Sequence, residues 1–128
     1  MNIVWFNDSE GKIKESIYRY VKQKDAHAFD KTNNVAIAEI GENVVGLIII
    51  KIKNHVRYLD HVEVEPAFRN RGIATQLVKE SVLRLQLLYV EFIYTPSLNA
   101  FFNRFAITSL KNDQNLIRLL IHPSSQKL

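Results

Sequence analysis

The apolar residues of this chain recur with two different spacings, and their alternation predicts the order of helices and strands. Between residues 11 and 24 the apolar side chains fall three or four positions apart, which is the spacing of one face of an amphipathic helix. Asp8 or Ser9 would cap that helix at its amino end. A second helical stripe runs from residue 72 to about 86, and a shorter helix is expected over 96–105.

Stretches rich in β-branched and aromatic residues predict seven strands around these helices. They are residues 2–6, 35–40, 44–52, 56–64, 87–94, 106–110 and 116–122. The third stretch is apolar at nearly every position, as expected of a central strand that is covered on both faces. The order β α β β β α β α β β indicates an α/β (α+β) fold, with a mixed central sheet of about six to seven strands and helices on both faces.

Composition and length are those of an ordinary globular protein. Of 128 residues, 47% are hydrophobic and 23% are charged, so we expect a single folded domain spanning residues 1–128 rather than disorder. Cysteine is absent, which excludes a disulfide framework and a thiol nucleophile, and the four histidines lack the spacing of metal ligands, so no metal is expected. Without a secretory signal pattern or a membrane-spanning apolar run, we expect a cytoplasmic protein with no membrane partner.

The stretch VEVEPAFRNRGIATQLV, residues 62–78, carries two arginines and a glycine where an apolar strand passes into an apolar helix. A helix start offers unpaired N–H groups, a glycine lets the backbone approach a ligand closely, and arginines favour phosphate. The formal net charge of +4 also favours anionic partners. A solvated arginine-rich loop is the alternative that composition leaves open. The residues of the predicted pyrophosphate cradle are Arg69, Asn70, Arg71, Gly72, Ile73, Ala74 and Thr75.

The same stretch resembles the coenzyme A motif of the GNAT superfamily of N-acetyltransferases. That motif is a strand with V-x-P-x-x-R at its end, followed by R/Q-x-x-G-x-G/A at the start of a helix. Arg69, Gly72 and Ala74 stand at the three diagnostic positions, and Pro66 follows the strand that Val64 ends. The predicted order of elements is also similar to that fold, from about residue 2 to the end of the chain.

The resemblance implies that the chain transfers the acetyl group of acetyl-CoA to an amine by direct attack. The pantetheine arm would lie in a split of the sheet against the backbone of Val62 and Val64, with Asn99 as a further hydrogen-bond partner. The amide N–H near Val64 would polarise the thioester oxygen. The sequence does not identify the amine acceptor, and it is compatible with a monomer or a homodimer. No recognition helix or aromatic RNA-binding pattern is present, so we do not expect nucleic acid as a substrate.

Attack on the thioester requires a neutral amine, and therefore a base or a water chain that removes a proton. The resemblance places acid/base residues at Tyr58 or Asp60, so Asp60 is the first candidate, acting through water. A surface aspartate without catalytic role is the alternative. Glu63 is the second candidate, because a β-bulge could invert the alternation of side chains, and Glu39 is the third. A regular strand would direct one set of side chains to one face, namely Tyr58, Asp60, Val62 and Val64.

The acid that protonates the leaving thiolate is harder to assign. The family's usual acid is a tyrosine in a pattern like F-Y-x-x-x-G-F, whereas this chain reads FFNRFAI at residues 101–107, with Phe102 at the tyrosine position. Water, or a nearby Tyr94, Ser97 or Asn99, would then supply the proton, or catalysis would be slow or lost. Phe102 therefore also favours the alternative function, a non-catalytic module of GNAT-like fold that binds coenzyme A or a partner protein.

Overall fold

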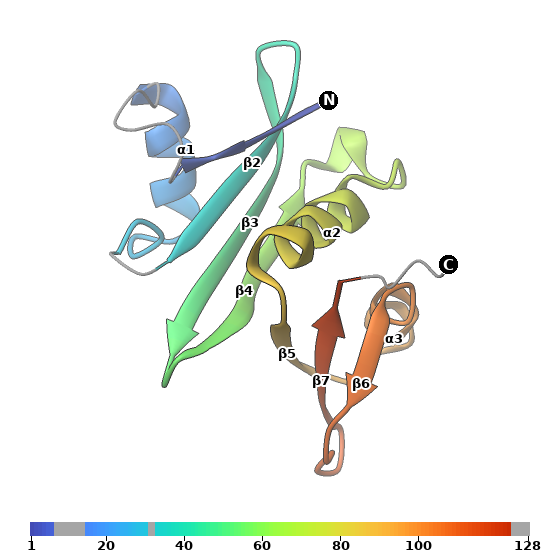
Figure 1. Ribbon diagram of the computed structural model, residues 1–128. Coiled ribbons are helices and arrows are strands. Elements are labelled where there is room, and N and C mark those ends of the chain that lie inside the picture. Colours follow the sequence, from blue (N-terminus) through green and yellow to red (C-terminus); the bar gives the residue numbers. More distant parts are fainter. Residues whose placement is uncertain (7–14, 31–32, 124–128) are drawn as a thin grey trace.

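The computed structural model describes residues 1–6, 15–30 and 33–123 of the protein, and these residues form one twisted sheet with helices on both faces (Figure 1). The helices and strands follow the order that the hydrophobic spacing predicts. In chain order they are β1 (Asn2–Trp5), α1 (Glu15–Lys24), β2 (Asn34–Ile40), β3 (Asn43–Lys53), β4 (Val56–Val64), α2 (Ile73–Leu85), β5 (Leu88–Ile93), α3 (Pro96–Phe102), β6 (Ala106–Ser109) and β7 (Leu116–His122).

Some boundaries differ from the sequence expectation. Helix α3 ends at Phe102 rather than Phe105, because the N–H groups of Arg104 and Phe105 each donate to a carbonyl three residues earlier, which closes a tight turn. A short 3-10 turn between β4 and α2 is not predicted by hydrophobic spacing. The expected start of the first helix and its cap at Asp8 or Ser9 lie outside the described residues.

The sheet has the strand order β1-β2-β3-β4-β5-β7-β6, and every neighbouring pair is antiparallel except β4 and β5. These two strands run parallel and are paired at one position in the described chain, Tyr58 opposite Tyr89. Because a parallel pair needs a crossover connection, α2 lies between them in sequence and packs on the sheet. Beyond Tyr58, β4 continues for six residues without a β5 partner, so its carboxyl end is open on that side.

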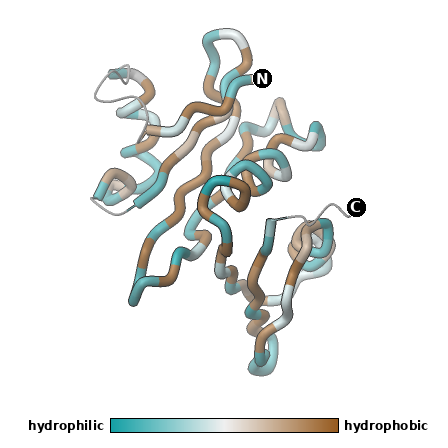
Figure 2. Tube along the Cα trace, viewed as in Figure 1, coloured by the Kyte–Doolittle hydropathy of each residue, from teal (hydrophilic) through white to brown (hydrophobic). Residues whose placement is uncertain are grey.

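The central strand β3 is buried on both faces, as its apolar run predicts. Ile48 and Ile50 belong to the core under α2, whereas Leu47 and Ile49 pack with Val21 of α1 on the opposite face. Hydrophobic residues accordingly dominate the middle of β2 and β3 (Figure 2). The strand therefore fixes the sheet between two cores, and it holds its neighbour β4 in place.

A β-bulge in β4 overturns the expected alternation of its side chains. Ile49 of β3 lies opposite His61, but the next residue, Ile50, lies opposite Leu59, so Asp60 is the extra residue on β4. The inserted residue shifts the period of two by one position. Leu59 and Val62 pack into the core under α2, whereas Asp60 contacts Lys51 on the α1 side. The sequence prediction that Tyr58, Asp60, Val62 and Val64 share one face is therefore wrong.

Candidate functional site

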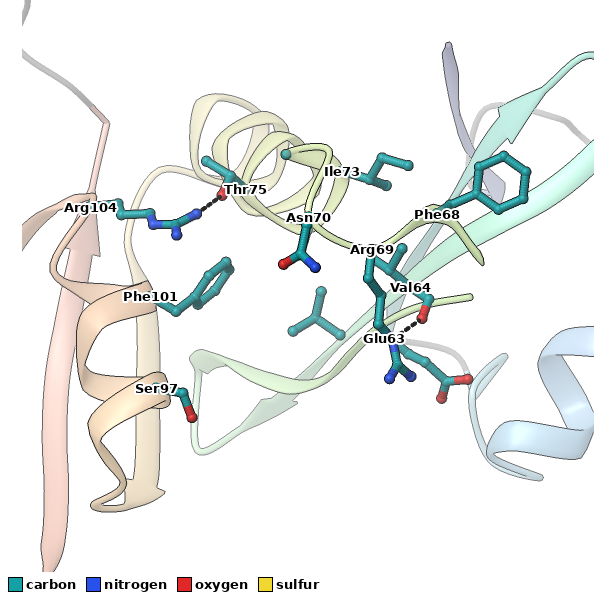
Figure 3. Close-up of a pocket in the computed structure, with 13 residues that line it drawn as sticks. Glu63, Val64, Phe68, Arg69, Asn70, Ile73, Thr75, Ser97, Phe101 and Arg104 are labelled. Atoms are coloured by element: carbon teal, nitrogen blue, oxygen red, sulfur yellow. Dashed lines mark hydrogen bonds between the residues drawn. The ribbon is translucent and has the colours of Figure 1, made fainter. Parts of the chain in front are cut away.

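A cavity of about 600 Å³ opens between the carboxyl end of β4, the amino end of α2 and helix α3 (Figure 3). It lies where β4 has lost its β5 partner, so backbone of β4 forms part of its wall. We call it the cradle cavity. Its lining residues are Val62, Glu63, Val64, Phe68, Arg69, Asn70, Gly72, Ile73, Ala74, Thr75, Ser97, Phe101 and Arg104.

The first turn of α2 presents its backbone N–H groups to this cavity. Gly72 stands at the N-cap with φ 80° and ψ 11°, a left-handed conformation that glycine adopts without steric cost. No side chain caps the helix in the described structure, so the N–H groups of its first turn remain available to an anion. The segment 72–75 is thus an uncapped helix start, a backbone arrangement that binds anions in many proteins.

Two arginines line this cavity on opposite walls, one at the end of β4 and one at the helix start. Arg69 Nε donates a hydrogen bond of 2.9 Å to the carbonyl oxygen of Val64, which ties its guanidinium to the end of β4. Arg104 reaches across from beyond α3, and its Nη1 lies 3.3 Å from Thr75 Oγ1 in the first turn of α2 (Figure 3). The Arg104 guanidinium also lies 5.8 Å from the centroid of the Phe101 ring. Arg104 is not among the site residues that the sequence predicts, although it lies inside the FFNRFAI segment.

Three residues predicted for the site are placed elsewhere by their side chains. The Arg71 guanidinium lies over the Phe68 ring at 5.1 Å and lines a separate cavity between β1 and α2. Tyr94 is 47% exposed, and in the described part of the chain neither Tyr94 nor Asn99 lines the cradle cavity. Phe102 is buried against Phe92, so the residue that α3 presents to the cavity at this point is Phe101.

A second cavity, of about 530 Å³, lies against the other end of β4, beside the single residue pair that joins this strand to β5. Its lining residues are Lys53, Asn54, Val56, Tyr58, Leu59, Asp60, Tyr89 and Glu91. Asp60 Oδ2 lies 3.4 Å from Lys51 Nζ, and that ammonium group is 2.7 Å from Asp25 Oδ2. We call this second cavity the β4–β5 cavity. Asp60, which the sequence predicts as a base, is part of its lining.

Glu63 is held in a polar cluster on the α1 side of β4. Its Oε2 lies 2.7 Å from Lys24 Nζ, and its Oε1 lies 2.8 Å from His61 Nε2. The hydrogen bond from Lys24, and then that from His61, lower the pKa of the Glu63 carboxyl despite partial burial. The same contact raises the pKa of Lys24. Glu63 is therefore an anion at neutral pH, and both of its oxygens already accept hydrogen bonds.

The lowered pKa of Glu63 predicts an acid-sensitive contribution to folding. The ionised carboxylate stabilises the fold above its ordinary unfolded pKa, and this stabilisation is lost as the pH falls through the lower folded value. We expect Glu63→Gln to cost about 0.5–1 kcal/mol of unfolding free energy at pH 7 and much less at pH 3. Urea unfolding of both proteins between pH 3 and 7 measures the difference. Glu15→Gln, which removes an exposed ion pair with Arg19, should stay close to wild type. A difference in unfolding free energy between Glu63→Gln and wild type that stays the same from pH 3 to pH 7 would contradict the prediction.

Across residues 1–6, 15–30 and 33–123, no group of three or more metal-ligating side chains is close enough to hold a metal ion. Within those ranges, no helix is both long and apolar enough to cross a bilayer.

Comparisons with known proteins agree on one fold. A model of the acetyltransferase (GNAT) family matches residues 2–95 of the chain. Similar solved structures include the PaiA N-acetyltransferase from Thermoplasma acidophilum in complex with coenzyme A, with a TM-score of 0.65 and 12% identity over 95% of this chain and 99% of that one. An acetyltransferase from Bacillus subtilis in complex with CoA gives 0.66 and 10% over 94% and 97%. An acetyltransferase of the GNAT family from Staphylococcus aureus gives 0.64 and 15% over 96% and 99%. No protein of curated function matches the chain in sequence.

Proposed function

Because the chain belongs to the acetyltransferase (GNAT) family, we propose that it transfers the acetyl group of acetyl-CoA to the amine of an acceptor, as a single domain. The observation that carries this proposal is the cradle cavity. It combines an uncapped helix start with two arginines, and it continues along a strand edge that has no partner. An elongated ligand with a phosphate group at one end fits both features.

In this proposal the residues of the cradle cavity divide between two parts of the coenzyme. The N–H groups of the first α2 turn, flanked by Arg69 and Arg104, bind the pyrophosphate. The open backbone of Val62 and Val64 on β4 binds the pantetheine arm as an added strand would bind. The acetyl end would then reach the middle of β4, where a backbone N–H can polarise the thioester oxygen.

The acceptor amine would approach from the β4–β5 cavity. This cavity contacts β4 up to Asp60, whereas the cradle cavity contacts it from Val62 onward, so the two meet along one strand. Asp60 remains a candidate base that acts through water. Ser97 lines the cradle cavity and is a candidate proton donor to the leaving thiolate, whereas the Tyr94 side chain lies outside its lining.

Thermal unfolding with and without ligand tests the cofactor assignment. A ligand that binds only the folded state, at a hundred times its dissociation constant, adds about 2.7 kcal/mol of stability. For a chain of this length we expect acetyl-CoA and free CoA each to raise the midpoint by roughly 8–12 °C. Pantetheine lacks the phosphates and should raise it far less. No shift with either coenzyme at millimolar concentration would refute the assignment.

A non-catalytic module that binds coenzyme A is the second candidate function. The observation in its favour is that the described lining of the cradle cavity contains no tyrosine, and Phe102 is buried in the core. Release of free thiol from acetyl-CoA, measured across a panel of small amines and peptides with free amino termini, separates the two. Thiol release that depends on an amine supports the transferase. Coenzyme binding without release across the panel supports the module.

A further inference from the structure

We propose that His61 is the general base of the acetyl transfer, held in its reactive tautomer by Glu63, which Lys24 in turn fixes. The assignment rests on the proposed acetyl transfer. His61 occupies the one β4 position between the two cavities, since the β4–β5 cavity ends at Asp60 and the cradle cavity begins at Val62. An acetyl group delivered from one side and an amine from the other would meet beside it.

The pairing of β4 with β3 determines the direction in which His61 points. His61 and Glu63 lie opposite Ile49 and Leu47 and point to the α1 side of β4, whereas Val62 between them packs toward α2. In Figure 3 the Glu63 carboxylate points away from α3 and toward the side on which α1 lies. The His61 side chain is 39% exposed, so its ring can touch a bound acceptor. The bulge brings Asp60 to this side as well, so Asp60, His61 and Glu63 share one face of β4.

The contacts of Glu63 fix which nitrogen of His61 carries the proton. An ionised carboxylate can only accept hydrogen bonds, so the Nε2 atom at 2.8 Å from Oε1 must carry a hydrogen. In the neutral ring the lone pair is then on Nδ1, which has no hydrogen-bond partner among the described residues. Lys24 holds the second carboxylate oxygen at 2.7 Å and prevents Glu63 from turning away. Glu63 and Lys24 are therefore positioning residues.

The other carboxylates near the ring are less suited to take the proton. Both oxygens of Glu63 already accept hydrogen bonds from cationic or donor groups. Asp60 shares the Lys51 ammonium with Asp25, which places a positive charge next to the spot where a substrate ammonium would have to bind. The charged groups on this side of the sheet therefore form two clusters: Glu63, which contacts His61 and Lys24, and Lys51, which contacts Asp25 and Asp60.

The proposed step conserves atoms and charge. The amine nitrogen attacks the thioester carbonyl carbon, so that a C–N bond forms and the C–S bond breaks. The proton on the amine nitrogen passes to His61 Nδ1, and the coenzyme leaves as a thiolate. The thiolate takes a proton from solvent, directly or through the hydroxyl of Ser97. The imidazolium returns its proton to solvent before the next turnover.

Bromoacetyl-CoA tests the assignment without knowledge of the acceptor. This analogue carries an alkylating carbon at the position of the acetyl methyl group, and a nearby nucleophile displaces bromide from it. If Nδ1 of His61 faces that position, a new N–C bond forms there and the ring proton is lost to solvent. We expect the label on His61 in the tryptic peptide 58–69, which also contains Asp60 and Glu63. Tandem mass spectrometry locates it, and excess CoA should prevent it.

Three variants distinguish the possible results of the labelling experiment. His61→Asn should lose the label while CoA still raises its unfolding midpoint, and Glu63→Ala should slow labelling at least tenfold when the reagent is saturating. His55→Asn, in the exposed β3–β4 turn, should label like wild type. CoA-protected label on Asp60 or Glu63, or none at all in a protein that binds CoA, would overturn the assignment of His61. Label that CoA does not prevent, in a protein whose midpoint CoA leaves unchanged, would instead refute the proposed function.

Discussion

Arg104→Glu is expected to weaken coenzyme A binding about a hundredfold. The Arg104 guanidinium stands 3.3 Å from Thr75 Oγ1, at the helix start where the pyrophosphate would bind. A hydrogen bond to a charged group contributes about 1.5–3 kcal/mol, which is roughly a tenfold to hundredfold change in affinity. The glutamate adds repulsion to this loss, so Arg104→Ala should cost less, about tenfold. Isothermal titration with CoA measures both variants.

Two other charge reversals serve as references for the effect of Arg104→Glu on coenzyme A affinity. Arg19→Glu changes the net charge equally on the exposed face of α1, and we expect its affinity to stay within twofold of wild type. Arg71→Glu distinguishes the sequence motif from the side-chain geometry, because the motif places Arg71 in the cradle whereas its guanidinium lies over Phe68. We expect a smaller loss for Arg71→Glu than for Arg104→Glu. Equal affinity of Arg104→Glu and wild type would remove Arg104 from the site.

Gly46→Val is expected to destabilise the fold by about 2–4 kcal/mol and to weaken coenzyme binding as well. A Cβ atom at Gly46 would stand 3.1 Å from Ile73 Cγ2 and 3.2 Å from Leu77 Cδ1, which is closer than packed carbon atoms normally approach. Valine adds two further methyl groups at this point, and overpacking of this kind costs about 1–3 kcal/mol or more. Ile73 is the first residue of α2, so its displacement also shifts the helix start that forms the cradle.

Urea unfolding and CoA titration of the same preparations test both parts of the Gly46 prediction. Ala106→Val adds the same two methyl groups to an exposed position of β6, where β-branched residues are well tolerated, and should change stability by less than about 0.5 kcal/mol. Gly46→Ala should fall between Gly46→Val and wild type. A Gly46→Val protein with wild-type stability and affinity would show that α2 can move away from β3 at no cost.

Local sequence signals determined much of this protein. The apolar run of β3 predicts burial on both faces, because only a strand between two cores can hide every side chain. The helices and strands have local periods, and their order follows from them. The cradle residues 69–75 are contiguous, so the turn, the glycine at the N-cap and the helix start that build it can be read from one short segment.

The tertiary structure decided everything that depends on where distant segments meet. Arg104 joins the cradle from 29 residues beyond Thr75, and no local period links the two. The extra residue at Asp60 is visible only in the pairing of β4 with β3, and it puts Asp60 on the same face as His61 and Glu63, where α1 brings Lys24. The steric clash that a side chain at position 46 would make with Ile73 and Leu77 likewise arises only because α2 packs against β3. Sequence periodicity specifies which residues form an element, whereas register and packing specify which side chains come together.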